Sequence, residues 1–233
     1  FNKSKILNDY LLKEVNDDAI VKINTDGEIL FKKSVIEILF ENKIWDQNHI
    51  TELKKNHEPV HLNCIEPVFN DTKYWKQGDV FINLKHKSQI VLYRPSTNKV
   101  INLIKGPFSM QHDIKVISDN KISIFNNNNF IYDNKYSEVL IYDFESEQFS
   151  KIFSKELQKE NFKTNLSGKS QILKDNSLFV EEQRHGRIIL LDNKGQKEWE
   201  YINKSKNGDV GYVSGCRIIE NKSFIKKFKS LIN

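Results

Sequence analysis

The chain has 233 residues, and 38% of them are hydrophobic and 11% aromatic, which is enough to build a packed core and excludes wholesale disorder. Its 36 basic and 31 acidic residues leave a formal charge of +5. The basic residues are almost all lysine and are dispersed along the chain. We therefore expect no nucleic-acid partner, which would require a clustered cationic face. No apolar run approaches the roughly 18 residues of a membrane-spanning helix.

The sequence predicts neither a metal site nor a cofactor. Cys64 and Cys216 lie far apart and form no Cys-x-x-Cys pair, so we interpret them as buried free thiols, with a disulfide between them as the alternative. No zinc-ligand spacing, phosphate-binding loop or dinucleotide fingerprint occurs.

The chain starts at Phe1 and carries no signal peptide, and we interpret it as a piece of a longer protein.

The first elements in chain order are a hairpin and a helical insertion. Residues 1–18 are expected to form an outer segment or the end of an earlier structural unit. Residues 20–32 are expected to form a hairpin, in which Thr25-Asp26-Gly27 supplies the tight turn. Ser34 then precedes apolar residues at helical spacing, which predicts a helix over 34–42, and a second helix is expected over 47–56.

From residue 61 onward the chain repeats one order of elements: an inner strand, a polar turn, a second strand and a closing hairpin. The expected inner strands span 61–65, 111–117, 169–173 and 215–219, and the second strands span 79–84, 121–125, 177–182 and 222–225. The closing hairpins at 90–100, 139–149 and 188–199 recur about every fifty residues, the length of a four-stranded propeller blade. We therefore predict an all-β fold, a single β-propeller domain over residues 1–233 that forms part of a roughly six-bladed ring.

Two histidines begin successive inner strands, where the blades of a propeller would direct them toward one central pocket. His61 lies two residues before Asn63, so both side chains point the same way in a strand, and His112 follows Gln111. Convergence of such groups is what a catalytic or binding site requires. The alternative is that both histidines are ordinary polar residues that satisfy backbone groups near the channel.

A second candidate is the charged run from Glu181 to Arg187. In an extended chain, Glu181, Gln183, His185 and Arg187 share one face. Histidine can act as a nucleophile or acid–base group near neutral pH, and arginine can clasp an oxyanion with two donors. The alternative is a charged strand end that leads into a turn.

The remaining polar candidates are weaker. Arg217, at the start of the last inner strand, is a further anion-binding candidate. A lyase or hydrolase that uses Glu181 and Glu182 is disfavoured because neighbouring residues of a strand point to opposite faces. His49, His57 and His86 are expected at the surface, and Asn126 to Asn129 in a loop.

Several segments, in this order, resemble the bacterial arylsulfotransferase family of β-propeller proteins over about residues 20–225. They are His61-Leu-Asn-Cys, Gly78-Asp-Val-Phe-Ile-Asn-Leu with Ser88-Gln-Ile-Val-Leu-Tyr, Gly106-Pro, Gln111-His-Asp with Ile124-Phe-Asn-Asn, Glu181-Glu with Gly186-Arg, and Trp199-Glu-Tyr. The Gln-His-Asp strand and its Phe-Asn-Asn continuation are the most specific of these.

The resemblance implies transfer of a sulfuryl group from a phenolic sulfate ester to a phenol, without a nucleotide donor, through a channel histidine that is transiently sulfated. It implies that His61 and His112 line the channel, that His185 corresponds to the nucleophile and that Arg187 clamps the sulfate. It also implies small-molecule aryl sulfate and phenol as partners, and a periplasmic or otherwise extracytoplasmic location. The arginine that follows the Gln-His strand in characterised members is missing from residues 126–135. A non-catalytic propeller that binds an anionic or aromatic ligand is therefore the alternative.

Overall fold

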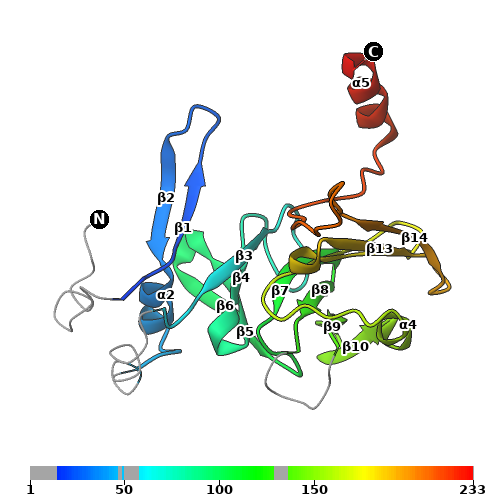
Figure 1. Ribbon diagram of the computed structural model, residues 1–233. Helices are drawn as coiled ribbons and strands as arrows, with labels where there is room; N and C mark the ends of the chain where they lie inside the picture. The colour runs from blue at the N-terminus through cyan, green and yellow to red at the C-terminus, as the bar shows by residue number, and fades with distance from the viewer. Residues whose placement is uncertain (1–14, 47–48, 50–57, 129–135, 233) are drawn as a thin grey trace.

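The computed structural model describes residues 15–46, 49, 58–128 and 136–232. Within them, three four-stranded antiparallel sheets follow a two-stranded hairpin along the chain (Figure 1). In each four-stranded sheet the strands lie side by side in sequence order. This is the order of elements that the repeat predicts, and the arrangement is propeller-like.

The described strands belong to the hairpin and the three sheets. The hairpin consists of β1 (Ala19–Ile23) and β2 (Ile29–Ser34). The first sheet holds β3 (Leu62–Pro67), β4 (Val80–Leu84), β5 (Gln89–Arg94) and β6 (Lys99–Lys105). The second holds β7 (His112–Ser118), β8 (Lys121–Asn126), β9 (Glu138–Asp143) and β10 (Gln148–Ile152). The third holds β11 (Lys169–Ile172), β12 (Leu178–Glu182), β13 (Arg187–Leu191) and β14 (Lys197–Ile202).

The first helix is present where the sequence predicts it. Helix α2 (Val35–Glu41) begins after Ser34, whose hydroxyl accepts a hydrogen bond from the Glu37 amide at 3.0 Å and so caps the helix. Its apolar side packs in one cluster with Ile82 and Val91 of the first sheet. The second predicted helix, over 47–56, lies almost entirely outside the described residues.

The sheets are joined through their first strands, which lie next to one another. Aliphatic and aromatic side chains of the first and second sheets share one buried cluster, which includes Phe81, Leu92, Ile114 and Leu140. Between β3 and β7, the sulfur of Cys64 accepts a hydrogen bond from the Ile114 amide at 3.4 Å. The cysteines are both free, so the alternative of a disulfide is wrong. Because the inner strands meet, their first residues lie at one end of the molecule.

The last predicted unit differs from the expectation. Residues 215–219 form no strand, although Gln171 of β11 exchanges two hydrogen bonds of 3.0 Å with the backbone of Ile218. The expected second strand at 222–225 lies in helix α5 (Lys222–Ile232). Phe224, Phe228 and Leu231 recur at helical spacing there, and none of the described strands pairs with this segment, so a helix satisfies the backbone.

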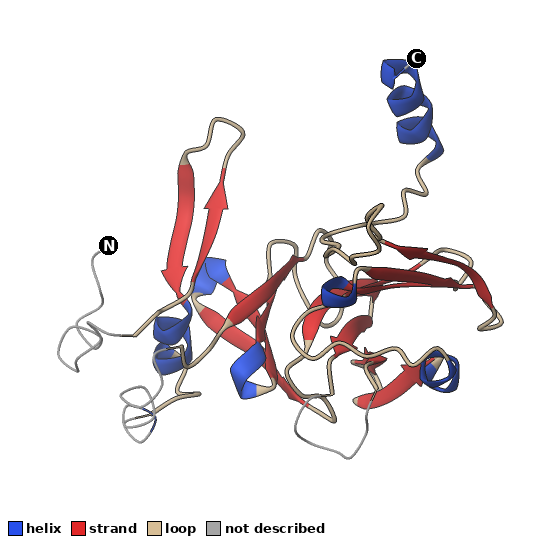
Figure 2. Ribbon diagram, viewed as in Figure 1, coloured by secondary structure: helices blue, strands red, loops and turns tan. Residues whose placement is uncertain are grey.

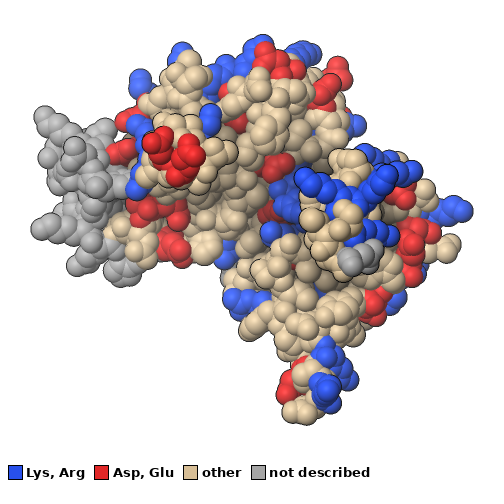
Figure 3. Space-filling view, turned by 90° about the horizontal axis from the view of Figure 1, so that it is seen from above, with Lys and Arg blue, Asp and Glu red and all other residues tan. Residues whose placement is uncertain are grey.

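Helix α5 projects away from the sheets, and no helix in the described part of the chain is long and apolar enough to cross a membrane (Figures 1 and 2). Acidic and basic side chains are interspersed over most of the face seen in Figure 3, with a basic group at α5. A further short helix, α4 (Ser154–Lys159), follows β10 and was not predicted.

Candidate functional site

The turns that follow the second strands place polar residues at the same end of the sheets as His61 and His112. In the first sheet this turn is η1 (Lys85–Lys87), and in the third it is η3 (Gln183–His185). In the second sheet the equivalent position is taken by Asn127 and Asn128 after β8. His61 precedes β3 and His112 begins β7, so both lie beside these turns.

The backbone around both histidines is unusual. His61 has a φ of 51°, and Met110, two residues before His112, has a φ of 53°. Asp113 has a φ of 37° and lies at the point where the pairing of β7 with β8 shifts register. Left-handed non-glycine residues cost free energy and persist where the surrounding structure imposes them, which is common at functional sites. The bulge at Asp113 sets the direction in which the neighbouring imidazole points.

The hydrogen bonds of His112 fix its tautomer. Its Nδ1 lies 3.0 Å from the carbonyl oxygen of Met110 and 2.6 Å from Oδ1 of Asn127. The orientation of the Asn127 amide is fixed in turn, because its Nδ2 donates to the carbonyls of Thr164 and Ser167 at 2.7 and 2.9 Å. Two acceptors face Nδ1, so this nitrogen carries the proton and Nε2 keeps a free lone pair.

The same surroundings keep His112 neutral. Burial lowers its pKa to about 4, the hydrogen bond to Asn127 works against that shift, and the positive charges of Lys85 and His61 add to it. At neutral pH the ring is therefore an uncharged imidazole with a lone pair on Nε2, which is the form that can attack an electrophile.

Lys85 supplies positive charge beside the two histidines. It is only 6% exposed, and its Nζ lies 3.4 Å from Nε2 of His61. Burial lowers the pKa of Lys85, while the charge of Glu58 raises it and that of Arg184 lowers it. Residues from the turns of the first and third sheets thus act on one another across the end of the molecule. We call His61, Lys85, His112 and Arg184 the basic cluster.

Asn63 and Gln111 hold the first two sheets together beneath the basic cluster. The Asn63 amide donates to the backbone carbonyl of Gln111 at 3.0 Å and accepts from Asn83 at 2.6 Å. The Gln111 side chain donates to Oδ1 of Asn83 at 2.7 Å and to the carbonyl of Gln89 at 3.1 Å. Both predicted residues therefore lie beside the histidines, with their amides used in bonds between the sheets.

Arg187 and His185 are both engaged with nearby carboxylates. The guanidinium of Arg187 donates to Glu182, to Glu200 at 3.3 Å and to the carbonyl of Glu160 at 2.9 Å, so its donors are engaged by the third sheet and by the C-terminal end of α4. The side chain of His185 is 60% exposed, and its Nδ1 lies 3.6 Å from Glu182.

The other predicted residues are likewise separate from the basic cluster. Glu181 is buried and accepts from Gln183 at 3.0 Å. Arg217 is exposed on the segment that follows the third sheet. His86 is half-buried rather than exposed as predicted, and His57 lies outside the described residues.

Lys85, Arg184 and Asn127 are the residues that sequence reasoning missed. Each lies one or two residues after the second strand of its unit, so aligning the three units at that strand would have shown polar side chains recurring in the turn that follows it. The lysine was overlooked because the chain is rich in lysine, and Asn127 because runs of asparagine are typical of loops.

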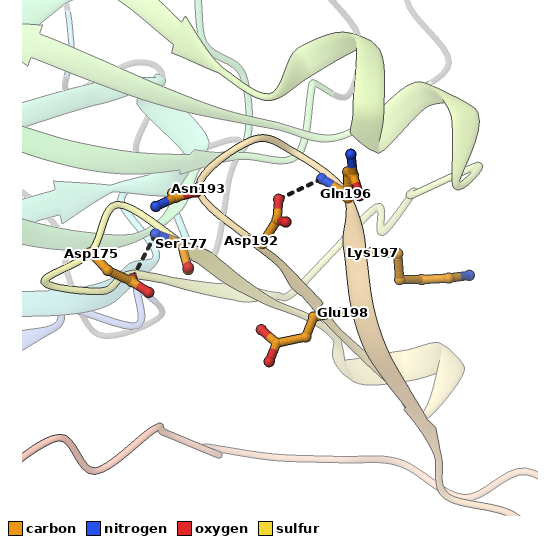
Figure 4. Close-up of a pocket in the computed structure, with 7 residues that line it drawn as sticks. All are labelled: Asp175, Ser177, Asp192, Asn193, Gln196, Lys197 and Glu198. Carbon is orange, nitrogen blue, oxygen red and sulfur yellow. Dashed lines mark hydrogen bonds between the residues drawn. The ribbon is translucent and has the colours of Figure 1, made fainter.

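A hollow of about 420 Å³ lies at the opposite end of the third sheet. It is lined by residues of two turns: Asp175, Ser177, Asp192, Asn193, Gln196, Lys197 and Glu198 (Figure 4). Its carboxylates serve the turns themselves, since Asp192 accepts from the amide of Gln196 at 2.8 Å and Asp175 from that of Ser177 at 3.0 Å. We assign no chemistry to it.

Known proteins give the following comparisons. Two solved structures show partial similarity to this chain. A protein of unknown function from Bacteroides caccae is 14% identical, with a TM-score of 0.50 over 79% of this chain and 59% of that one, so this chain spans little more than half of that protein. Apo AztD from Citrobacter koseri is 14% identical, with a TM-score of 0.34 over 53% of this chain and 31% of that one. No curated protein shows significant sequence similarity to the chain.

The family comparison covers most of the sequence. The model of the arylsulfotransferase (ASST) family matches residues 9–204, a range that contains all three four-stranded sheets and the whole basic cluster. This agrees with the resemblance seen in the Gln-His-Asp strand and its continuation. The chain belongs to the arylsulfotransferase (ASST) family.

Proposed function

We propose that the protein transfers a sulfuryl group from a phenolic sulfate ester to a phenol, with Nε2 of His112 as the nucleophile. The observation that carries the proposal is the pair of acceptors that face Nδ1 of the buried His112, in a site where the charge of Lys85 also acts on this ring. We further propose that the sheets are blades of a closed, roughly six-bladed β-propeller that works outside the cytoplasm, as the family resemblance implies.

In the first half of the reaction, Nε2 of His112 attacks the sulfur atom. The bond between sulfur and the aryl oxygen breaks, and the phenolate leaves with the electron pair, so the sulfuryl group is bound to the imidazole nitrogen. The charges of Lys85 and Arg184 stabilise the sulfuryl oxygens and the departing phenolate. In a site shielded from water this stabilisation is larger than at the surface.

In the second half, the oxygen of the acceptor phenol attacks the sulfur and the nitrogen–sulfur bond breaks. The phenol loses its proton to solvent, and His112 regains its lone pair. Asn127 keeps the proton on Nδ1 throughout, so the same tautomer is ready for the next cycle. Direct attack of the phenol on the aryl sulfate is difficult, and the histidine replaces it with two easier steps.

Turnover of a chromogenic aryl sulfate by the full-length protein, in the presence of phenol, tests the proposal. We expect His112→Gln to abolish turnover, and His185→Gln to retain it because that side chain is mostly exposed and lies outside the basic cluster. Loss of turnover in the His185 variant with full activity in the His112 variant would overturn the assignment.

A non-catalytic binding module remains the second candidate. Two observations favour it: residues 126–135 lack the arginine expected after the Gln-His strand, and the donors of Arg187 are engaged by Glu182, Glu200 and the carbonyl of Glu160. Such a module would bind an aryl sulfate at the basic cluster without consuming it. Saturable binding without phenol release, across a panel of esters, would support it over the enzyme.

A further inference from the structure

We infer that Glu58, His61 and His86 form a binding site for a divalent transition-metal ion of the Zn²⁺ class. Each side chain offers one ligand atom, and the three atoms lie within 4.8 Å of one another. Two imidazole nitrogens and one carboxylate oxygen form a donor set that Zn²⁺ takes in proteins, with a fourth position left for water or an anion. The site does not depend on the proposed sulfuryl transfer.

His86 is oriented as a ligand by its second nitrogen. Its Nδ1 donates to the backbone carbonyl of Glu58 at 2.7 Å, so Nε2 carries the free lone pair. Its own amide donates to the carbonyl of Val60 at 3.1 Å, which ties the η1 turn to the segment that carries the other two ligands. Metal-ligating histidines commonly have this kind of hydrogen bond to a backbone carbonyl, since it fixes the tautomer and the ring.

Glu58 and His61 are already close enough to share an ion. Nδ1 of His61 is buried and lies 2.9 Å from Oε2 of Glu58, but without the alignment of a hydrogen bond. The His61 and His86 rings lie 4.6 Å apart, centroid to centroid. Metal–ligand bonds of about 2.0–2.2 Å separate neighbouring ligand atoms by roughly 3–3.5 Å. Small side-chain rotations would therefore close the site around an ion, which would replace a proton on Nδ1 of His61.

Lys85 distinguishes this site from an ordinary polar cluster. Its ammonium group lies 3.4 Å from Nε2 of His61, and its charge interacts with that of Glu58. A cation in this position opposes the approach of a metal ion. Removing the charge of Lys85 should consequently strengthen metal binding, whereas it should weaken the binding of an anionic ester. The two kinds of ligand are thus affected in opposite directions by one substitution.

Titration of the untagged full-length protein with Zn²⁺ by calorimetry, and with Co²⁺ by visible absorption, tests the inference. We expect one bound ion per chain, at least a tenfold loss of affinity in Glu58→Gln and in His86→Gln, and tighter binding in Lys85→Met. His49→Gln is the matched control, since Nδ1 of His49 also lies 2.9 Å from a carboxylate, that of Asp46, and we expect it to bind as the parent does.

Two results would overturn the site: no stoichiometric binding of either ion, or equal losses in the His49 control and the His86 variant. Thermal unfolding of each variant shows whether a loss of metal binding reflects a loss of fold. The Lys85→Met variant avoids this difficulty, because the predicted result there is tighter metal binding, which an unfolded protein would not give. Turnover of an aryl sulfate, measured with and without a chelator, reports on the proposed function separately. Metal binding without turnover would leave this inference standing, and turnover without metal binding would refute this inference alone.

Discussion

The depressed pKa of His112 makes the stability of the protein depend on pH in a defined window. In the unfolded chain this histidine titrates near 6.5, and in the folded protein burial lowers its pKa to about 4. Between these values the unfolded state binds a proton that the folded state does not. The free energy of unfolding therefore falls as the pH drops from about 6.5 to 4, and this one group accounts for about 3 kcal/mol of that fall.

Substitution by glutamine isolates this contribution. In His112→Gln the amide can still donate to Asn127, but no proton is taken up, so the fall in stability between pH 7 and pH 4 should be smaller by about 3 kcal/mol than in the parent protein. Urea unfolding at a series of pH values measures the difference, and His49→Gln serves as the control for a partly exposed histidine. Parallel stability curves for the parent and the His112 variant would refute the reasoning, as would an NMR titration that places the pKa of His112 near 6.5.

Three further predictions concern other parts of the structure. Lys85→Met should lower kcat/KM for an aryl sulfate roughly tenfold to a hundredfold, because it removes a charged donor worth about 1.5–3 kcal/mol; unchanged steady-state kinetics would exclude this lysine from the site. Arg94→Met should destabilise the fold by roughly 2–3 kcal/mol. The Asp79 carboxylate is 1% exposed and accepts two hydrogen bonds of 2.8 Å from the Arg94 guanidinium, so the substitution removes its charged partner. Chemical denaturation checks this, and the double variant with Asp79→Asn should recover part of the loss. Gly186→Ala should cost about 1–3 kcal/mol, because φ is +58° and the new Cβ would collide with the carbonyl oxygen of Gly211; an unchanged Tm would contradict it.

Much of the sheet structure follows from local patterns. The inner strands at 61–65, 111–117 and 169–173 correspond to β3, β7 and β11, because alternating apolar residues between turn residues specify a strand wherever partners flank it. The segment at 222–225 has a similar local pattern but is helical, since no neighbouring strand pairs with it. Local sequence could not show this, because the outcome depends on what surrounds the segment.

The candidate site was predictable only in part. The repeat directs attention to the residues that begin the inner strands, and in the structure the charges of His61 and Lys85 both act on His112. The tautomer of His112 could not be predicted, because it depends on Asn127, whose amide is fixed by carbonyls about forty residues further along the chain. The grouping of His61 with Glu58 and His86 was not predicted for the same reason, since the turn that follows β4 brings the three residues together.

The most direct test of the account is to find the covalent intermediate. The full-length protein would be mixed with an aryl sulfate in the absence of an acceptor phenol, quenched within seconds under alkaline conditions and mapped by peptide mass spectrometry. The account predicts a sulfuryl group on the imidazole of His112, which is lost on addition of phenol. It also predicts much less of this intermediate in Asn127→Leu, in which the Met110 carbonyl is the one acceptor left for the proton on Nδ1. A sulfuryl group on His185, or phenol release with every histidine unmodified, would contradict it.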